Sequence, residues 1–206
     1  MAVWRGFECL FIFVSLFALC CGQWGWRLPP GYACVERPVQ AICRLRPNPT
    51  LMSSEYRDIQ GIVIFTQRIT CFGHYSLQVK INIAGLPANG TWDYHGIHVH
   101  ESGDMSRGCE SMGPHYNPYG TAHGSPRDPE SRRHVGDFGN VVKDPFGNIQ
   151  GALFDNIASL VGRTSILRRG VVLHEMQDDL GRGINRESLR TGNAGRRLAC
   201  CVIEPL

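Results

Sequence analysis

The sequence has few lysines, little helical periodicity and no repeats. Lys80 and Lys143 are the only lysines, so arginine carries almost all of the positive charge, and the formal net charge is only +3. So small an excess gives no support for a nucleic-acid-binding function and is compatible with a weak attraction to anions. Internal repeats and low-complexity tracts are absent. The 43% hydrophobic and 19% charged content is that of a globular chain.

Long apolar runs are also lacking, apart from one near the N-terminus. The run "CLFIFVSLFALCC" follows Arg5, is too short to span a bilayer and ends at small residues near Gly22. These features predict a signal peptide over residues 1–22 and a secreted protein. An uncleaved membrane anchor is the alternative. Once the signal is removed, we expect no transmembrane anchor.

If the protein is secreted, its nine cysteines become candidates for disulfides. Signal removal would leave six of them, an even number that predicts disulfides in an oxidising compartment. One N-glycosylation sequon is present, "NGT" at Asn89, because Pro49 blocks the "NPT" at Asn48. We therefore predict glycosylation at Asn89.

The texture of the chain changes near residue 57. Residues 23–56 are rich in Trp, Pro, Arg and Cys without periodicity, and predict an irregular extension held by disulfides. From Ile59 onward, short β-rich runs alternate with Gly, Pro, Asn and Asp clusters, which predicts an all-β sandwich or Greek-key barrel. Two connections, at 102–136 and 175–195, are too long for hairpins. Their content of His, Asp and Arg indicates functional loops.

Histidines dominate the candidate functional residues. His98 and His100 alternate along one predicted strand and therefore share a face. Two histidines at this spacing often bind no metal ion when the chain offers no other ligands. The next loop, however, adds three histidines and one carboxylate within 23 residues: His115, His123, His134 and Asp137. Three imidazoles and a carboxylate form a closed tetrahedral set, which is typical of structural zinc.

A further histidine, His174, ends the predicted strand "GVVLH". It can meet His98 and His100 at the mouth of the sandwich, and neutral imidazoles of this number suit copper. An imidazole has two donor nitrogens. His115 could therefore serve both metals at once.

Five segments together resemble the Cu/Zn superoxide dismutase family, in particular its extracellular branch: "HGIHVHESGD", "GCESMGPHYNP", "RRHVGDFGN", "GVVLHEMQDDLG" and "GNAGRRLACCVI". The resemblance covers residues 59 to about 203 and implies an eight-stranded Greek-key sandwich or barrel over 57–206, with two long functional loops. It implies copper on His98, His100, His115 and His174. The implied zinc ligands are His115, His123, His134 and Asp137.

The resemblance also assigns supporting roles. Asp178 would link a copper histidine to a zinc histidine, and Arg197 would attract and orient a small anion beside the copper. Two disulfides are implied, Cys109–Cys200 and Cys43–Cys201. Cys34 and Cys71 stay without an assigned pairing.

Partners follow from the same resemblance. It implies a homo-oligomer, either a dimer or a tetramer. The final "CVIEPL" has none of the basic residues of a heparin-binding tail, so we expect no such tail. The arginines in "RRH" (132–134) and "LRRG" (167–170) are expected to be solvated.

The implied function is a secreted superoxide dismutase, an oxidoreductase. Superoxide would reduce copper and leave as oxygen, and a second superoxide would reoxidise it and yield hydrogen peroxide. His115 would be a catalytic proton carrier beside Arg197. Two alternatives are a non-catalytic secreted copper carrier on the same fold, and a purely structural sandwich.

Overall fold

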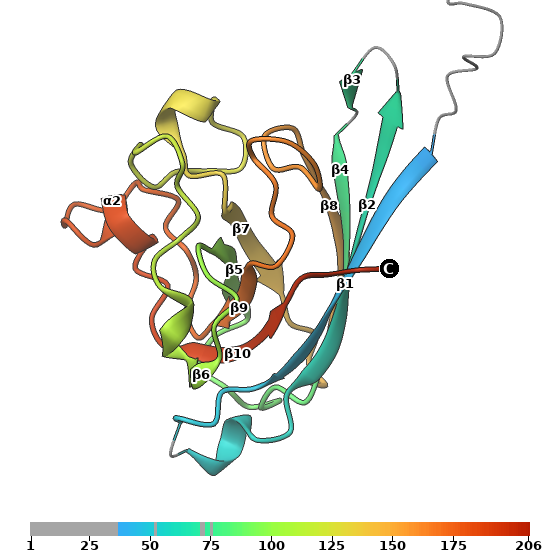
Figure 1. Cartoon of the computed structure of the whole chain (residues 1–206). Helices are drawn as coiled ribbons and strands as arrows, with labels where there is room; N and C mark the ends of the chain where they lie inside the picture. The colour runs from blue at the N-terminus through green and yellow to red at the C-terminus, as the bar shows by residue number, and fades with distance from the viewer. Residues whose placement is uncertain (1–36, 52, 71–72, 75) are drawn as a thin grey trace, which may run out of the picture. The chain divides into compact units, whose positions relative to one another are not determined.

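The structure is a computed structural model that describes residues 37–51, 53–70, 73–74 and 76–206. The expected signal peptide, Cys34 and Cys71 lie outside these residues. Eight strands follow one another by antiparallel pairing (Figure 1), in the order β7 (Asp137–Val142), β5 (Tyr94–His100), β9 (Gly170–His174), β10 (Arg197–Val202), β1 (Arg37–Pro47), β2 (Gln60–Thr70), β4 (Leu77–Ala84) and β8 (Ile149–Asp155). Contacts between β7 and β8 nearly close this path into a barrel. The predicted all-β, eight-stranded fold is confirmed.

The remaining elements are short. They are η1 (Ser54–Tyr56), β3 (Gly73–His74), β6 (Ser106–Cys109), η2 (Glu110–Met112), η3 (Glu130–Arg132), α2 (Ser188–Thr191) and β11 (Glu204–Pro205). In the part of the chain that the structure describes, no helix is long and apolar enough to cross a membrane.

Alternation along the strands builds the core. On β4, Leu77, Val79, Ile81 and Ile83 are buried, while Lys80 and Asn82 between them are exposed. Successive side chains of a strand point to opposite faces, so one face of each strand fills the barrel and the other meets solvent or loops.

One expectation is wrong. Residues 37–47 do not belong to an irregular extension, because they form β1, which pairs with β2 along most of its length. Its inward residues Ala41, Cys43 and Leu45 are buried, so the strand contributes to the core. Because the strand contains arginine, proline and cysteine, composition alone does not reveal its alternation of buried and exposed residues.

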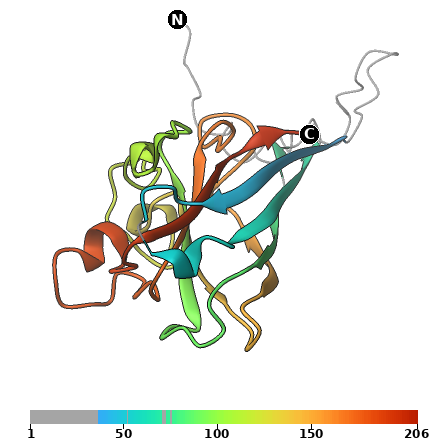
Figure 2. The same ribbon diagram turned by 90° about the horizontal axis from the view of Figure 1, so that it is seen from below.

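Both long connections lie on the same side of the barrel, outside the sheet that contains β5 and β9 (Figures 1 and 2). The first joins β5 to β7 and contains β6, and the second joins β9 to β10 and contains α2. The disulfide Cys109–Cys200 ties the first connection to β10, and Cys43–Cys201 ties β1 to β10. Both cysteine pairs implied by the resemblance are therefore bonded in the structure.

Candidate metal centre

Strand alternation explains the spacing of His98 and His100. Ile97 and Val99 point into the barrel core, so the two histidines between and after them point to the other face of β5. Loops cover that face. Both rings are consequently buried, with relative exposures of 0% and 1%.

His174 joins them from the neighbouring strand. Leu173 points into the core, and His174, the last residue of β9, therefore faces the loops as His98 and His100 do. The His98 and His174 ring centroids are 4.9 Å apart, and those of His100 and His174 are 5.5 Å apart. The predicted meeting of three strand histidines takes place.

Each of these three rings donates one N–H to a fixed acceptor. His98 Nε2 donates to Asp178 Oδ2 at 2.9 Å. His100 Nδ1 donates to the Gly113 carbonyl at 2.8 Å, and His174 Nδ1 donates to the Gly195 carbonyl at 3.3 Å. These bonds fix each ring and its tautomer, which leaves one nitrogen per ring as a lone-pair donor.

The remaining nitrogens face one another. Within the described part of the chain, His98 Nδ1 and His115 Nε2 are buried without a hydrogen-bond partner, and His100 Nε2 lies 3.3 Å from His174 Nε2. In this group of four histidines, the ligand atoms all lie within 4.8 Å of one another. Buried polar nitrogens without partners are costly, and a metal ion at their centre would satisfy them.

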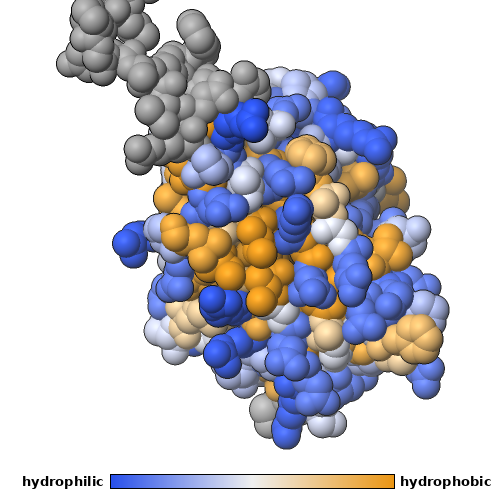
Figure 3. All heavy atoms as spheres, turned by 90° about the vertical axis from the view of Figure 1, so that its right-hand side faces the viewer, coloured by the Kyte–Doolittle hydropathy of each residue, from blue (hydrophilic) through white to orange (hydrophobic). Residues whose placement is uncertain are grey.

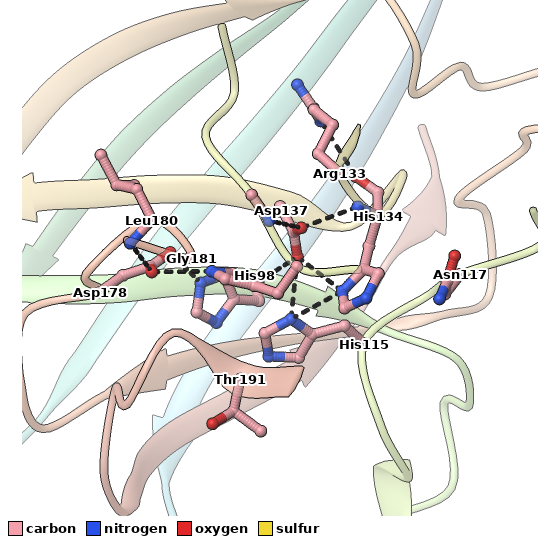
Figure 4. A network of polar contacts seen from close by, with 12 residues as sticks. His98, His115, Asn117, Arg133, His134, Asp137, Asp178, Leu180, Gly181 and Thr191 are labelled. Carbon is pink, nitrogen blue, oxygen red and sulfur yellow. Dashed lines mark hydrogen bonds and ion pairs between the residues drawn. The ribbon is translucent and has the colours of Figure 1, made fainter. Parts of the chain in front are cut away.

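A second group converges on one carboxylate oxygen (Figure 4). Oδ1 of Asp137 lies 2.9 Å from His115 Nδ1, 2.9 Å from His123 Nδ1 and 3.0 Å from His134 Nδ1. His115 Nδ1 and His134 Nδ1 are 3.4 Å apart. His115 thus contributes one nitrogen to each group.

These separations fit a tetrahedral ion. Zinc binds nitrogen and oxygen at about 2.0–2.1 Å, so ligand atoms at the corners of a tetrahedron around it lie about 3.3 Å apart. His123 Nδ1 has no hydrogen-bond partner although Asp137 is within ion-pair distance, so the oxygen and the nitrogen meet without a proton aligned between them. The donor set therefore fits a bound metal better than a hydrogen-bonded cluster.

Backbone groups hold the second carboxylate oxygen. Oδ2 of Asp137 accepts hydrogen bonds from the backbone N–H of Gly124 at 3.0 Å and of His134 at 2.8 Å. His134 Nε2 donates to the Thr121 carbonyl at 3.1 Å. Oδ1 is thereby left to face the three histidines.

Asp178 connects the two groups. Its Oδ2 accepts from His98 and its Oδ1 accepts from His123 Nε2 at 2.8 Å, so one buried carboxylate orients a ring of each group. Asn140 holds the Asp178 backbone on both sides, through its amide and its carbonyl oxygen. Gly192 has a φ of +66°, and a Cβ there would collide with both Asp178 and His123. A glycine is therefore required at this position.

Burial keeps three of the ligand histidines neutral. Burial lowers the pKa of His115 to about 3 and holds the pKa values of His100 and His174 well below the usual range. Burial also acts to lower the pKa of His123, but attraction to the carboxylates of Asp137 and Asp178 outweighs it and raises that pKa to about 9, so a metal ion that binds here must displace a proton from this ring. Neutral imidazoles are the form that binds metal.

An open hollow of ≈650 Å³ leads to the four-histidine group. Its lining includes His100, His115, His174 and Arg197. Arg197 donates to the carbonyls of Cys109 and Gly113, each at 2.7 Å, and lies opposite His174 in the β9–β10 register. Burial lowers its pKa, yet a guanidinium stays charged at neutral pH.

Arg133 is a correction to the sequence analysis. It is 1% exposed rather than solvated, and its Nη2 pairs with Asp155 Oδ2 at 2.6 Å. Its other N–H groups donate to the carbonyls of Pro126, His134 and Val135, which fixes the loop that carries His134. No spacing in the sequence separates this arginine from exposed Arg132.

Arg169 is also not fully solvated. It stacks over the Tyr116 ring at 3.5 Å. His95 bonds through Nδ1 to the His174 carbonyl at 2.9 Å and belongs to neither histidine group. Asn89 lies exposed in a turn.

Comparison with known proteins agrees with this geometry. The family model "Copper/zinc superoxide dismutase (SODC)" matches residues 59–203. Extracellular superoxide dismutase [Cu-Zn] of Rattus norvegicus is 45% identical over 169 residues, 81% of this chain and 63% of the rat protein. The chain thus spans less than two thirds of that relative's length.

For two further relatives, the match covers a larger share of the relative's own length. Extracellular superoxide dismutase [Cu-Zn] of Drosophila melanogaster is 43% identical over 166 residues, 81% of this chain and 85% of the fly protein. Superoxide dismutase [Cu-Zn] of Saccharomyces cerevisiae is 50% identical over 125 residues, 61% of this chain and 78% of the yeast protein. With two metal-ligand groups that share one buried histidine, and with these matches, the chain belongs to the copper/zinc superoxide dismutase family.

Proposed function

We propose that this protein is a secreted Cu/Zn superoxide dismutase. The reaction takes two superoxide anions and two protons to one dioxygen and one hydrogen peroxide. The single observation that carries the proposal is the buried His115, whose two nitrogens belong to two different ligand groups. A purely structural sandwich has no use for that arrangement. Membership of the family supports the same function.

The donor sets support one metal in each group. Copper would be held by His98, His100, His115 and His174, and zinc by His115, His123, His134 and Asp137. Bound copper supplies the one-electron redox chemistry, while zinc has no redox role and fixes its ligands. Asp178 would orient one ring of each group.

Arg197 would bind and orient the substrate. Two of its N–H groups are engaged by carbonyls, so the guanidinium is held rigidly in the lining of the hollow. A fixed positive charge beside His174 attracts a small anion and favours its approach over that of neutral reductants.

His115 would handle the proton. Among the residues that the structure describes, its Nε2 atom has no hydrogen-bond partner, so this nitrogen would be the one to carry a proton on the copper side.

Secretion and its companions belong to the same proposal. Two disulfides between described residues and the exposed sequon at Asn89 support an extracellular, glycosylated protein with a signal peptide at 1–22. A homo-oligomer is proposed by analogy with the family.

The test is metal content and superoxide dismutation of the secreted protein beside His115→Ala and Arg197→Ala variants. We expect one copper and one zinc per chain in the native protein. His115→Ala should lose activity together with part of its metal. Arg197→Ala should retain both metals, because Arg197 belongs to neither ligand group, and should lose at least tenfold in kcat/KM through weaker attraction of the substrate.

The main rival is a copper carrier on the same fold. A native protein that binds copper without dismutating superoxide would establish the carrier and refute the enzyme. Equal kcat/KM for native protein and Arg197→Ala would remove the role given to Arg197.

A further inference from the structure

Met176 lines the hollow that leads to the four-histidine group and has no role in the proposed function. The hollow lies on the loop side of the barrel, whereas Figure 3 shows the opposite side, where apolar residues at the centre are surrounded by hydrophilic ones. Of the described residues in the lining, Met176 alone carries sulfur. Its side chain is half-buried, so the thioether is within reach of a small solute that enters the hollow.

Backbone hydrogen bonds fix the place of Met176. The residue comes two positions after His174, which ends β9. Its N–H donates to the Ala194 carbonyl, and its own carbonyl accepts from the Gly96 N–H, each at 2.9 Å. Met176 is thereby tied both to β5 and to the segment before β10, and it cannot leave the hollow without breaking both bonds.

Gly195 brings the thioether close to a ligand ring. A Cβ added at Gly195 would lie 2.9 Å from Cγ of Met176 and 3.3 Å from its sulfur, so the thioether packs against the Gly195 backbone. The carbonyl of the same glycine accepts the hydrogen bond of His174 Nδ1 at 3.3 Å. The sulfur and the His174 ring therefore lie beside one residue.

Charge does not draw a cation into this hollow. Arg190 and Arg197 are both in the lining, and the lining carboxylate, Glu187, pairs with Arg190 at 2.9 Å. The net charge of the lining is thus positive, which repels a metal ion. A neutral donor can still hold such an ion, and a thioether is a neutral, soft donor that prefers Cu(I) to harder ions.

We propose that Met176 is a transient ligand for Cu(I) on its way into the four-histidine group. The inference rests on the proposed function in one respect, namely that this group is the copper site. The thioether captures the soft cation in the hollow. His115 Nε2, which has no hydrogen-bond partner among the described residues, and the other free ring nitrogens then take the ion over.

The transfer is a ligand exchange without a change of oxidation state. Four imidazoles that converge on one point hold copper more tightly than a single sulfur, so the exchange runs inward. Cu(II) is a harder ion and gains little from the thioether. Met176 therefore affects the rate at which Cu(I) enters, and not the amount of copper that is bound at the end.

The experiment measures copper uptake by the full chain after its copper has been removed and its zinc retained. It is done under argon and without thiol reductant, so that both disulfides persist. Cu(I) is supplied as its bicinchoninate complex, whose loss of colour gives the uptake rate, and Cu(II) is supplied separately as its glycine complex. Circular dichroism before loading shows that each protein is folded.

The test variant is Met176→Leu, which removes the sulfur and keeps an apolar side chain of similar volume against Gly195. Met105→Leu is the matched control, because Met105 is exposed and lies outside the lining of the hollow. We expect Cu(I) uptake to be at least fivefold slower in Met176→Leu than in the native protein and the control. Cu(II) uptake should differ less than twofold, and the final copper content should be equal in all three proteins.

Equal Cu(I) rates in the native protein and Met176→Leu would overturn the proposal. So would an equal slowing of Cu(I) and Cu(II), because altered packing at Gly195 would then explain the effect without sulfur chemistry. A lower final copper content in Met176→Leu would make Met176 a permanent ligand and would overturn the transient role. A native protein that takes up no copper would refute the proposed function together with this inference, whereas uptake at unchanged rates refutes this inference alone.

Discussion

The Asp178 side chain is buried and holds the imidazole rings of two histidines. It accepts from His98 Nε2 at 2.9 Å and from His123 Nε2 at 2.8 Å. Asp178→Ala leaves both N–H groups without an acceptor and frees both rings to turn. We expect the affinity for both metals to fall about 10- to 100-fold, as is usual when such a carboxylate is removed.

Competition with chelators of known affinity measures this loss separately for copper and zinc. Glu204→Gln is the control, since it removes an exposed carboxylate from β11, which pairs with β1 and carries no residue of the two ligand groups. Unchanged affinity in Asp178→Ala would show that the rings are oriented by their strands alone.

Tyr56 makes stability depend on pH in alkaline solution. Burial, with the nearby charge of Glu175, raises the pKa of its phenol from 10.0 to about 12. The unfolded chain therefore ionises first as the pH rises, and stability present below pH 10 is lost progressively up to about pH 12.

We expect the free energy of unfolding to fall more steeply across this interval in the native protein than in Tyr56→Phe. Urea unfolding at a series of pH values measures it. Parallel slopes in the two proteins would contradict the role of Tyr56.

At the scale of elements, one buried ion pair joins the loop before β7 to the end of β8. Arg133 pairs with Asp155 and also donates to the His134 and Val135 carbonyls. Arg133→Leu leaves a buried carboxylate unpaired. We expect a loss of about 3–5 kcal/mol in the free energy of unfolding and weaker zinc binding through His134.

Denaturant unfolding measures the first effect and zinc competition the second. Arg133→Leu/Asp155→Asn removes the unpaired charge and keeps an oxygen for the N–H groups of Ile157 and Ala158. It should recover part of the loss. Equal stability of the single and double variants would contradict the cost assigned to the buried charge.

For the whole molecule, metal binding should couple to folding. The ligand nitrogens face one another in the interior, and the unfolded chain offers no such group. A metal at 1,000 times its Kd stabilises by about 4 kcal/mol. For a domain of this size, that shifts Tm by about 10 °C.

Scanning calorimetry before and after chelation, without reductant so that the disulfides persist, checks this. Tm should fall on chelation and return when copper and zinc are restored. An unchanged Tm would show that metal binding contributes nothing to the free energy of folding.

Particular residues show which features of the fold and the site can be predicted from the sequence. The alternation of His98 and His100 with Ile97 and Val99 is local, because a strand fixes which side chains share a face, and it predicted the shared face. The spacing of histidines in the first loop likewise predicted the second group. Strand β1 was missed because its arginines mask an alternation that only pairing with β2 reveals.

By itself, therefore, the sequence determined the all-β fold, the family and the identity of the residues in the two histidine groups. Tertiary structure alone decided which nitrogen of each ring stays free, since that depends on acceptors distant along the chain, such as Asp178 for His98. It also decided that Arg133 is buried while Arg132 is exposed. Burial and the choice of hydrogen-bond or ion-pair partners depend on contacts between elements that are distant along the chain, so local sequence does not predict them.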